Sequence, residues 1–570
     1  MTSELKTSPS VSAANHAALD IPLQALTVGA QRLPRLTYSE RRQLLDRCAE
    51  GVQRSARDWV AVACRAKRIA VDSPVAAEEI LAGPVCVLRY LRLLSRVLRD
   101  VERRGAPDLP GPARQNSQRR TCVPVLPVAW LFDSLIFMGL QAEVWLEPDA
   151  DQQLRFEFGS HTNVNTDDAP SAKIAGVLGA GNVSAIPATD MLAKIFQEGE
   201  VVLLKLNPVN EYLEPVLSSA FEPLIAADLL RIVRGDASVG QAIVEHPNID
   251  SLHLTGSHLT HDAIVWGADP AERARRQQQQ QPLVSKPVTS ELGNVTPWIV
   301  VPGHFTARQL DAQAEQLVAS IVNNASFNCL ASKVIVTSRP WSQRGEFLDL
   351  LETKLKRVPP RYAYYPGAGQ RFERATGAAA PASGDGCLPW TLVRDADPEQ
   401  SPELFRDESF VCVCAETALD ANTPQAFLEA AVDFANDQLF GTLCANLTIP
   451  DAFAKQESAA VERALANLRY GTVSINQWAG VAYGMMTPPW GGFPGATLRD
   501  PQSGIGQVHN SFGIKSIEKT VLRGPLCSLL KPAWFANHRT AHRIAWALLD
   551  FYHRPSVLRL PKIVLQALRG

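Results

Sequence analysis

The 570-residue sequence has no continuous apolar run that approaches the roughly 20 residues a membrane-spanning helix needs. It also lacks an excess of charge, because 56 basic and 58 acidic side chains leave a formal net charge of −2. We therefore expect neither a transmembrane domain nor nucleic-acid binding through a broadly basic surface. Residues 1–15 are polar and contain no apolar segment, so we expect no secretory signal.

The sequence contains ten cysteines, but no two of them form a CxxC pair, and their spacing matches no small disulfide scaffold. Thiols scattered in this way are typical of a reducing compartment, so we expect a cytoplasmic protein. No cluster of cysteine and histidine has the spacing of a metal site, and we predict no metal.

The chain is too long for one compact core, so two or more domains are expected. Residues 1–20 are predicted to be a disordered leader, and 21–291 a first domain. From about residue 173, short apolar strands alternate with helices, which indicates an α/β fold with a parallel, doubly wound sheet. A second α/β domain covers 292–490, followed by a return segment over 491–526.

A β-hairpin is predicted at about residues 140–170. Val144–Leu146 and the segment 154–158 are apolar-rich, and they flank the turn-forming run that begins at Pro148. The edge of such a hairpin could pair with a second subunit, so we expect a homodimer or homotetramer.

Several polar residues follow predicted strands of the first domain. Asn182 lies in the turn after the strand 174–178, Lys205 ends the strand 201–205, and Gly256-Ser257 follows the strand 251–254. The carboxyl ends of parallel strands face the ligand crevice of such sheets. Taken singly, each is as well explained by an ordinary turn or a surface lysine.

Cys329 and Glu291 could form an acyl-transfer site. A thiolate attacks a carbonyl carbon, and a carboxylate can activate either the thiol or a water molecule. Alone, Cys329 would more often be a buried structural cysteine, and Glu408 in Glu408-Ser409-Phe410 a solvated acid.

The order of these residues along the chain is more specific than any one of them. Over residues 35–520 the sequence resembles the aldehyde dehydrogenase superfamily, most clearly at Glu291-Leu292-Gly293, around Cys329 and at Glu408-x-Phe410. The resemblance implies an aldehyde dehydrogenase-like α/β fold: a Rossmann-type cofactor domain over 21–291, an α/β catalytic domain and a β-hairpin oligomerisation element.

The resemblance also implies a reaction, the oxidation of an aldehyde to a carboxylic acid. Cys329 would attack the aldehyde carbon, and the Asn182 side chain would hold the oxyanion of the thiohemiacetal. After hydride transfer to NAD or NADP leaves a thioester, Glu291 would activate the water that hydrolyses it.

The remaining motif residues would bind the dinucleotide. Lys205 would contact a ribose, Gly256 and Ser257 the pyrophosphate, and Glu408 the nicotinamide ribose, with Phe410 beside the nicotinamide. The acid that many relatives carry three residues after the lysine is Pro208 here, which leaves NAD and NADP both open.

Two alternatives stay open. The segment around Gly181-Asn182-Val183 also resembles fatty acyl-CoA reductases, which convert an acyl thioester to an aldehyde, although Glu291 favours hydrolysis. A non-catalytic relative is the third alternative, and the presence of Cys329, Glu291 and Asn182 argues against it.

The segment 527–570 contains large apolar residues between clusters of arginine and lysine. It could be a basic amphipathic anchor at a membrane surface. The alternative is a helix that packs on the body of the protein or on a neighbouring subunit.

Overall fold

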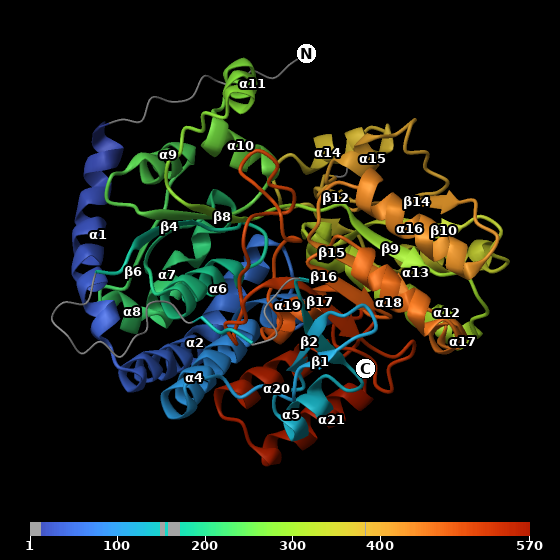
Figure 1. Ribbon diagram of the computed structural model, residues 1–570, viewed down its shortest axis with the longest axis horizontal. Helices are drawn as coiled ribbons and strands as arrows, with labels where there is room; N and C mark the ends of the chain where they lie inside the picture. The colour runs from blue at the N-terminus through green and yellow to red at the C-terminus, as the bar shows by residue number, and fades with distance from the viewer. Residues whose placement is uncertain (1–12, 149–153, 158–170, 382–383) are drawn as a thin grey trace.

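The computed structural model describes residues 13–148, 154–157, 171–381 and 384–570. Within them the chain forms two main β-sheets, each flanked by helices (Figure 1). A two-stranded ribbon of β11 (Arg361–Tyr362) and β12 (Cys387–Leu388) lies outside these sheets. None of the described helices is long and apolar enough to cross a membrane.

The smaller sheet has five strands in the order β6-β5-β4-β7-β8, and every neighbouring pair is parallel. The inner strands β5 and β7 are buried along their whole length, and β4 along all but its last residue, as expected for a sheet covered on both faces. The predicted doubly wound sheet is therefore confirmed. Its strands are β4 (Ile174–Leu178), β5 (Val201–Lys205), β6 (Leu230–Val233), β7 (Ser251–Thr255) and β8 (Val288–Glu291).

Part of the predicted disordered leader is instead a helix, α1 (Ala13–Arg32), which lies along the outer side of the small sheet (Figure 1). Leu19, Leu23 and Leu26 recur at helical spacing and are all at least 98% buried. This apolar stripe covers one face of the sheet, which is why the segment folds. Residues 1–12 of the predicted leader lie outside the described residues.

The larger sheet has ten strands in the order β1-β2-β3-β17-β16-β15-β9-β10-β14-β13. The strands from β17 to β13 are parallel, and β3, β2 and β1 extend the sheet in antiparallel fashion. The strands are β1 (Arg114–Gln115), β2 (Thr121–Leu126), β3 (Gln141–Leu146), β9 (Thr296–Val300), β10 (Ser332–Ser338), β13 (Thr391–Val393), β14 (Val413–Leu419), β15 (Cys444–Thr448), β16 (Thr472–Ile475) and β17 (Ile517–Arg523).

The predicted hairpin is wrong in its pairing. Strand β3 pairs with β2 on one side and with β17 on the other, so it is an interior strand rather than an exposed edge. In the described part of the second segment, Phe156 bridges to Ile514 instead of to β3; residues 149–153 and 158–170 lie outside the described residues. The edge-strand argument for assembly no longer holds for β3, and the homodimer or homotetramer stays a prediction.

The C-terminal segment (residues 527–570) folds onto the body of the protein. It contains α20 (Ala541–His553) and α21 (Leu560–Leu568), and α20 packs against α2, α3 and α4. Ile544, Leu548 and Phe551 are buried, and the Phe551 ring meets Phe132 of α5 edge to face with centroids 5.1 Å apart. Of the two alternatives for this segment, the structure supports a helix packed on the body of the protein for α20 and gives no support to the membrane anchor, because the apolar face of α20 is covered by protein.

The remaining helices cover the two sheets and join them. The capping box predicted at Thr37 and Glu40 is present and begins α2. The helices are α2 (Tyr38–Ala66), α3 (Ala77–Ile80), α4 (Cys86–Arg104), α5 (Trp130–Ile136), α6 (Ile186–Ala193), α7 (Glu214–Ala220), α8 (Glu222–Ala226), α9 (Ala237–Glu245), α10 (His258–Trp266), α11 (Pro270–Gln279), α12 (Ala307–Val322), α13 (Arg344–Arg357), α14 (Ala368–Thr376), α15 (Glu403–Arg406), α16 (Pro424–Gln438), α17 (Asp451–Gln456), α18 (Ser458–Asn467) and α19 (Gly480–Met485).

Candidate active site

Four of the predicted site residues lie at one edge of the five-stranded sheet. Asn182 follows β4, Lys205 is the last residue of β5, Ser257 follows β7, and Glu291 is the last residue of β8. Because parallel strands end at the same edge, residues far apart in sequence are brought together there. Ser257 also caps α10, since its hydroxyl accepts a hydrogen bond from the main-chain N–H of Thr260.

Cys329 lies in the loop between α12 and β10, a strand of the ten-stranded sheet. The turn before it is strained, because Asn324, Ala325 and Ser326 have φ values of 53°, 53° and 68°. Residues with side chains rarely adopt this left-handed conformation, and such strain persists only where neighbouring contacts hold it. The main-chain N–H of Asn324 donates to the Glu78 carboxylate at 2.9 Å, which is one of those contacts.

The loop after α12 meets the end of β8 where Cys329 lies against Glu291. The thiol donates a hydrogen bond to Glu291 Oε1, with 3.0 Å between Sγ and the oxygen. Burial raises the pKa of the Glu291 carboxyl to about 7, and burial together with the nearby Glu291 and Glu408 carboxylates raises the pKa of the Cys329 thiol well above its usual value. The pair thus holds a protonated thiol beside a carboxylate that ionises near neutral pH.

Asn182 lies close to this pair and is held by both its side chain and its main chain. Its Nδ2 donates to the main-chain oxygen of Phe327 at 3.0 Å, which leaves a second amide hydrogen on the same nitrogen. Its main-chain oxygen accepts hydrogen bonds from Lys67 Nζ at 3.0 Å, Asn324 Nδ2 at 3.0 Å and the Tyr364 hydroxyl at 2.9 Å.

Lys67 and Tyr364 are positioning residues that sequence reasoning missed. Besides Asn182, both also bind Asn324 Oδ1, at 2.8 and 3.0 Å, so they tie the turn after β4 to the strained turn before Cys329. The Lys67 ammonium is buried and paired with Glu79 at 2.7 Å. Nothing in the sequence marks Lys67, a lone lysine directly after α2, as part of a site, whereas Asn324 belongs to the recognised motif around Cys329.

Two cavities meet at the thiol. A large one, of about 1030 Å³, runs along the edge of the five-stranded sheet, and a smaller one, of about 340 Å³, lies on the side of the C-terminal segment. Ile186, Glu291 and Cys329 line both cavities. A molecule in either cavity could therefore reach the sulfur atom, as a two-substrate reaction requires.

The larger cavity brings together all the residues expected to bind a dinucleotide. Lys205, Gly256, Ser257, Glu408 and Phe410 line it. Its volume is suited to an elongated ligand, and its lining mixes apolar residues with polar groups that can fix the orientation of a cofactor. Burial lowers the pKa of the Lys205 ammonium, whose Nζ donates to the main-chain oxygen of Leu206 at 3.1 Å.

The surroundings of Glu408 show whether the larger cavity can bind a dinucleotide. The Glu408 carboxylate is buried, burial raises its pKa above the ordinary value, and Oε1 has no hydrogen-bond partner among the described residues. An unpaired buried acceptor that faces a cavity is suited to the hydroxyl groups of a ribose. Gly293 makes room for it, since a Cβ at this position would lie 2.2 Å from Glu408 Oε2.

Phe410 belongs to an aromatic cluster at the end of this cavity. It has a left-handed φ of 42°, and its ring centroid lies 5.7 Å from that of Phe327 and 5.1 Å from that of Tyr365. The Arg371 guanidinium lies 5.8 Å from the Phe410 centroid. The cluster offers an apolar surface for a flat ring next to Cys329.

Comparison with known proteins gives results in agreement with this geometry. The model of the aldehyde dehydrogenase family matches residues 170–361, a range that contains Asn182, Lys205, Glu291 and Cys329. A relative from Mycolicibacterium smegmatis, named "Putative succinate-semialdehyde dehydrogenase" with NADP(+) specified, is 25% identical over 362 residues. The match covers 60% of this chain and 62% of that protein, so it spans less than two thirds of the relative's length.

Solved structures with the same fold cover nearly the whole chain. An aldehyde dehydrogenase from Mycobacterium tuberculosis in complex with NAD+ has a TM-score of 0.59 at 17% identity, over 90% of this chain and 92% of that chain. A glyceraldehyde-3-phosphate dehydrogenase from Methanocaldococcus jannaschii in complex with NADP has a TM-score of 0.58 at 14% identity, over 92% and 97%. The family model therefore identifies an aldehyde dehydrogenase family domain over residues 170–361, and the solved structures show that the chain has the aldehyde dehydrogenase fold.

Proposed function

We propose that this protein oxidises an aldehyde to a carboxylic acid, with NAD or NADP as the electron acceptor. The observation that carries the proposal is the hydrogen bond of 3.0 Å between Cys329 Sγ and Glu291 Oε1 at the junction of two cavities. A nucleophile and its base in direct contact, with space for two ligands, is the arrangement that covalent carbonyl chemistry needs.

In the first half of the reaction, Glu291 accepts the thiol proton and the thiolate of Cys329 attacks the carbonyl carbon. A carbon–sulfur bond forms, and the electron pair of the carbonyl π bond moves onto oxygen. The free amide hydrogen on Asn182 Nδ2 and the main-chain N–H of Cys329 stabilise this oxyanion. Donors of this kind typically contribute about 3 kcal/mol each to the transition state.

The chain's residues fit a nicotinamide dinucleotide in the larger cavity. Lys205 and Glu408 would bind ribose hydroxyls, Gly256 and Ser257 would receive the pyrophosphate at the start of α10, and Phe410 would lie beside the nicotinamide. When bound, the nicotinamide supplies the hydride acceptor that converts the thiohemiacetal on Cys329 to a thioester.

In the second half, Glu291 first releases the thiol proton to solvent. Ionised again, it takes a proton from a water molecule, which attacks the thioester carbon. The carbon–sulfur bond breaks, the carboxylic acid leaves, and the Cys329 thiolate is regenerated. Oε1 of Glu291 faces the sulfur, so the second carboxylate oxygen, Oε2, would accept the proton of the water.

Reduction of an acyl thioester to an aldehyde is the alternative. That reaction gains nothing from an activated water, so the contact between Glu291 and Cys329 favours oxidation.

The purified protein is incubated with a series of aldehydes and each nicotinamide cofactor, and the absorbance of the reduced cofactor is followed. Rapid oxidation that is lost in Cys329→Ala, with dinucleotide binding retained, supports the proposal. Fast reduction of acyl-CoA with little aldehyde oxidation would overturn it.

A further inference from the structure

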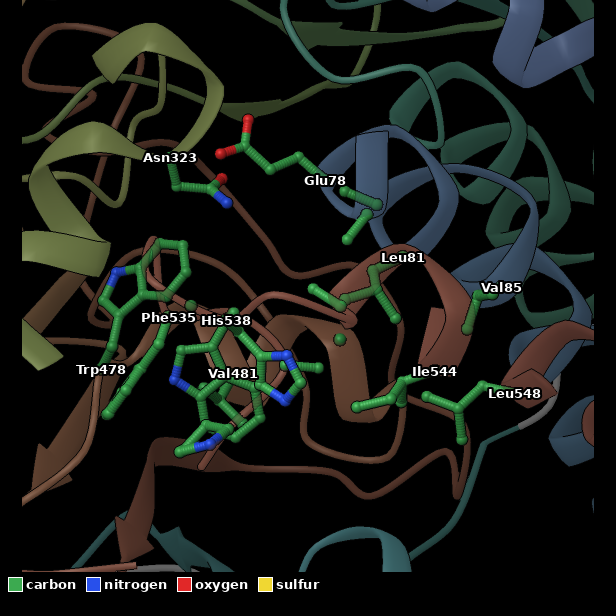
Figure 2. Close-up of a pocket in the computed structure, with 18 of the residues that line it drawn as sticks. Glu78, Leu81, Val85, Asn323, Trp478, Val481, Phe535, His538, Ile544 and Leu548 are labelled. Atoms are coloured by element: carbon green, nitrogen blue, oxygen red, sulfur yellow. The ribbon is translucent and has the colours of Figure 1, made fainter. Parts of the chain in front are cut away.

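The smaller cavity at Cys329 is walled by the C-terminal segment (residues 527–570). Figure 2 shows Phe535, Ile544 and Leu548 of this segment around the same space as Leu81 and Val85. A volume of about 340 Å³ lies within the usual range for small-molecule sites, about 300–1,000 Å³. The segment that sequence reasoning assigned to a membrane surface therefore forms one wall of the space next to the nucleophile.

The lining of this cavity is mostly apolar over its whole extent. Many of its hydrophobic residues come from three parts of the chain: the segment between α2 and α4, the segment around α5, and the C-terminal segment. They include Val75, Leu81, Val85, Leu135, Ile136, Phe137, Met138, Leu530, Phe535, Ile544, Leu548 and Ile563. Such a surface gains free energy by covering hydrocarbon and offers little to a polar ligand.

The charged groups of the lining are few. Glu78 and Arg361 neutralise each other through two contacts of 3.2 and 3.3 Å, and Glu291 is the base already described. Lys531, on the C-terminal segment, is the other cation of the lining. A substrate carboxylate could pair with Lys531 without breaking the ion pair between Glu78 and Arg361. At any other place in the cavity the carboxylate would lose its hydration and gain no cation in return.

We infer that residues 527–570 form the distal wall of the aldehyde site and that the substrate class is aldehydes with an apolar chain or ring. This inference rests on the proposed function. The carbonyl carbon lies at Cys329, and the hydrocarbon part extends between Leu81 and Val85 on one side and Ile544 and Leu548 on the other. The short, carboxylate-bearing aldehyde in the name of the M. smegmatis relative does not suit this lining.

For an apolar substrate site, kcat/KM should depend on the length of the aldehyde's carbon chain. Burial of one methylene group is worth about 0.8 kcal/mol, which corresponds to about a fourfold change in kcat/KM. For straight-chain aldehydes from propanal upward, kcat/KM should therefore rise about fourfold per added carbon until the cavity is full, and then level off. The plateau reports the length of the space between Cys329 and the C-terminal segment.

Gly484 provides a variant that fills the cavity. It lines the cavity, and a Cβ placed on it would meet no atom within 4 Å. In Gly484→Leu the added side chain should occupy the substrate space, so the ratio of kcat/KM for octanal to that for propanal should fall at least tenfold. Gly345 in α13 is equally open but lies outside the cavity lining, so Gly345→Leu should leave that ratio unchanged.

Phe535→Ala tests the wall itself, because Phe535 is a partly buried residue of the C-terminal segment. Removal of the ring should lower kcat/KM for octanal several-fold more than for propanal. Circular dichroism and the thermal midpoint confirm that each variant is folded. Two independent substitutions, on α19 and on the C-terminal segment, keep the test valid if one of them misfolds.

The decisive measurement is kcat/KM of the wild-type protein for propanal, octanal, phenylpropanal and succinate semialdehyde. A steep rise with apolar length, flattened in Gly484→Leu and Phe535→Ala but not in Gly345→Leu, is the expected result. A preference for succinate semialdehyde that is lost in Lys531→Met would overturn the inference and leave the proposed function intact. If no aldehyde reduces either cofactor, the proposed function itself is wrong, and the inference with it.

Discussion

The Cys329 thiol donates a hydrogen bond to Glu291 Oε1 across 3.0 Å, so the proposed nucleophile and the proposed base are in direct contact. The pKa of Glu291 is raised to about 7 by burial. As a base it works only when ionised, so kcat/KM should rise about tenfold per pH unit up to about pH 7 and then level off. A pH profile of steady-state rates checks this, and a profile governed by an ordinary carboxyl near pH 4.5 would contradict it.

The raised pKa of Glu291 should also make the free energy of unfolding depend on pH. The folded-state pKa of Glu291 lies above its unfolded value of 4.5, so between these values the unfolded chain releases a proton that the folded protein keeps. Stability contributed by this group is therefore present below pH 4.5 and is lost as the pH rises toward 7. Glu291→Gln should be more stable than wild type at pH 8, by roughly 1–3 kcal/mol. Denaturant unfolding at pH 8 and pH 4.5 measures the difference, which should vanish at the lower pH.

Gly293 should be required for dinucleotide binding. A methyl group there would lie 2.2 Å from Glu408 Oε2 and push the carboxylate away from the cavity. We expect Gly293→Ala to weaken binding of NAD or NADP at least tenfold while costing little stability, because a flexible side-chain end can move. Fluorescence titration with each cofactor gives the Kd, and Gly345→Ala, at an exposed and open position, is the matched control. An unchanged Kd in Gly293→Ala would remove Glu408 from the cofactor site.

Tyr364 should act on catalysis through Asn182. Its hydroxyl donates to the Asn182 main-chain oxygen at 2.9 Å and to Asn324 Oδ1 at 3.0 Å. Tyr364→Phe should lower kcat about threefold to tenfold, because the oxyanion donor is held less firmly, at a stability cost of about 1 kcal/mol. Tyr470 is also buried and donates to a main-chain oxygen, that of Ala435, at 2.8 Å, but it lines neither cavity.

Comparison of Tyr364→Phe with Tyr470→Phe distinguishes a role in positioning Asn182 from a role in the stability of the fold. Tyr470→Phe should lose a similar free energy of unfolding and keep its kcat. If both variants lose activity in proportion to their stability, Tyr364 is a structural residue only. A fall in kcat with unchanged KM in Tyr364→Phe alone supports its role at the oxyanion.

The small sheet and the main site residues could be predicted because each signal was local. Strand β5 is a run of apolar residues that ends at Lys205, whereas β8, which ends at Glu291, is mostly polar and was not predicted as a strand. The order of such residues along the chain then placed them at one sheet edge. The Cys329 contact with Glu291 follows from the superfamily resemblance rather than from either segment alone.

Pairings over long sequence separations could not be predicted. The partner of β3 is β17, more than 350 residues later, and nothing near Val144 indicates it. The pattern of α20 shows an apolar face but not what covers it, so protein and membrane were equally consistent with Ile544 and Phe551. Lys67 was missed for a related reason, since its role depends on Asn182 and Asn324, which lie far along the chain.

Pre-steady-state kinetics of Glu291→Gln test the central claim most directly, namely that Cys329 carries a thioester which Glu291 hydrolyses. At pH 9, where hydroxide can take the thiol proton, a burst of one reduced cofactor per Cys329 should precede a slow phase, and mass spectrometry should find the acyl group on the peptide that contains Cys329. The wild type should show continuous turnover, and Cys329→Ala neither burst nor acyl group. Full steady turnover in Glu291→Gln, or an acyl group on another residue, would contradict the account.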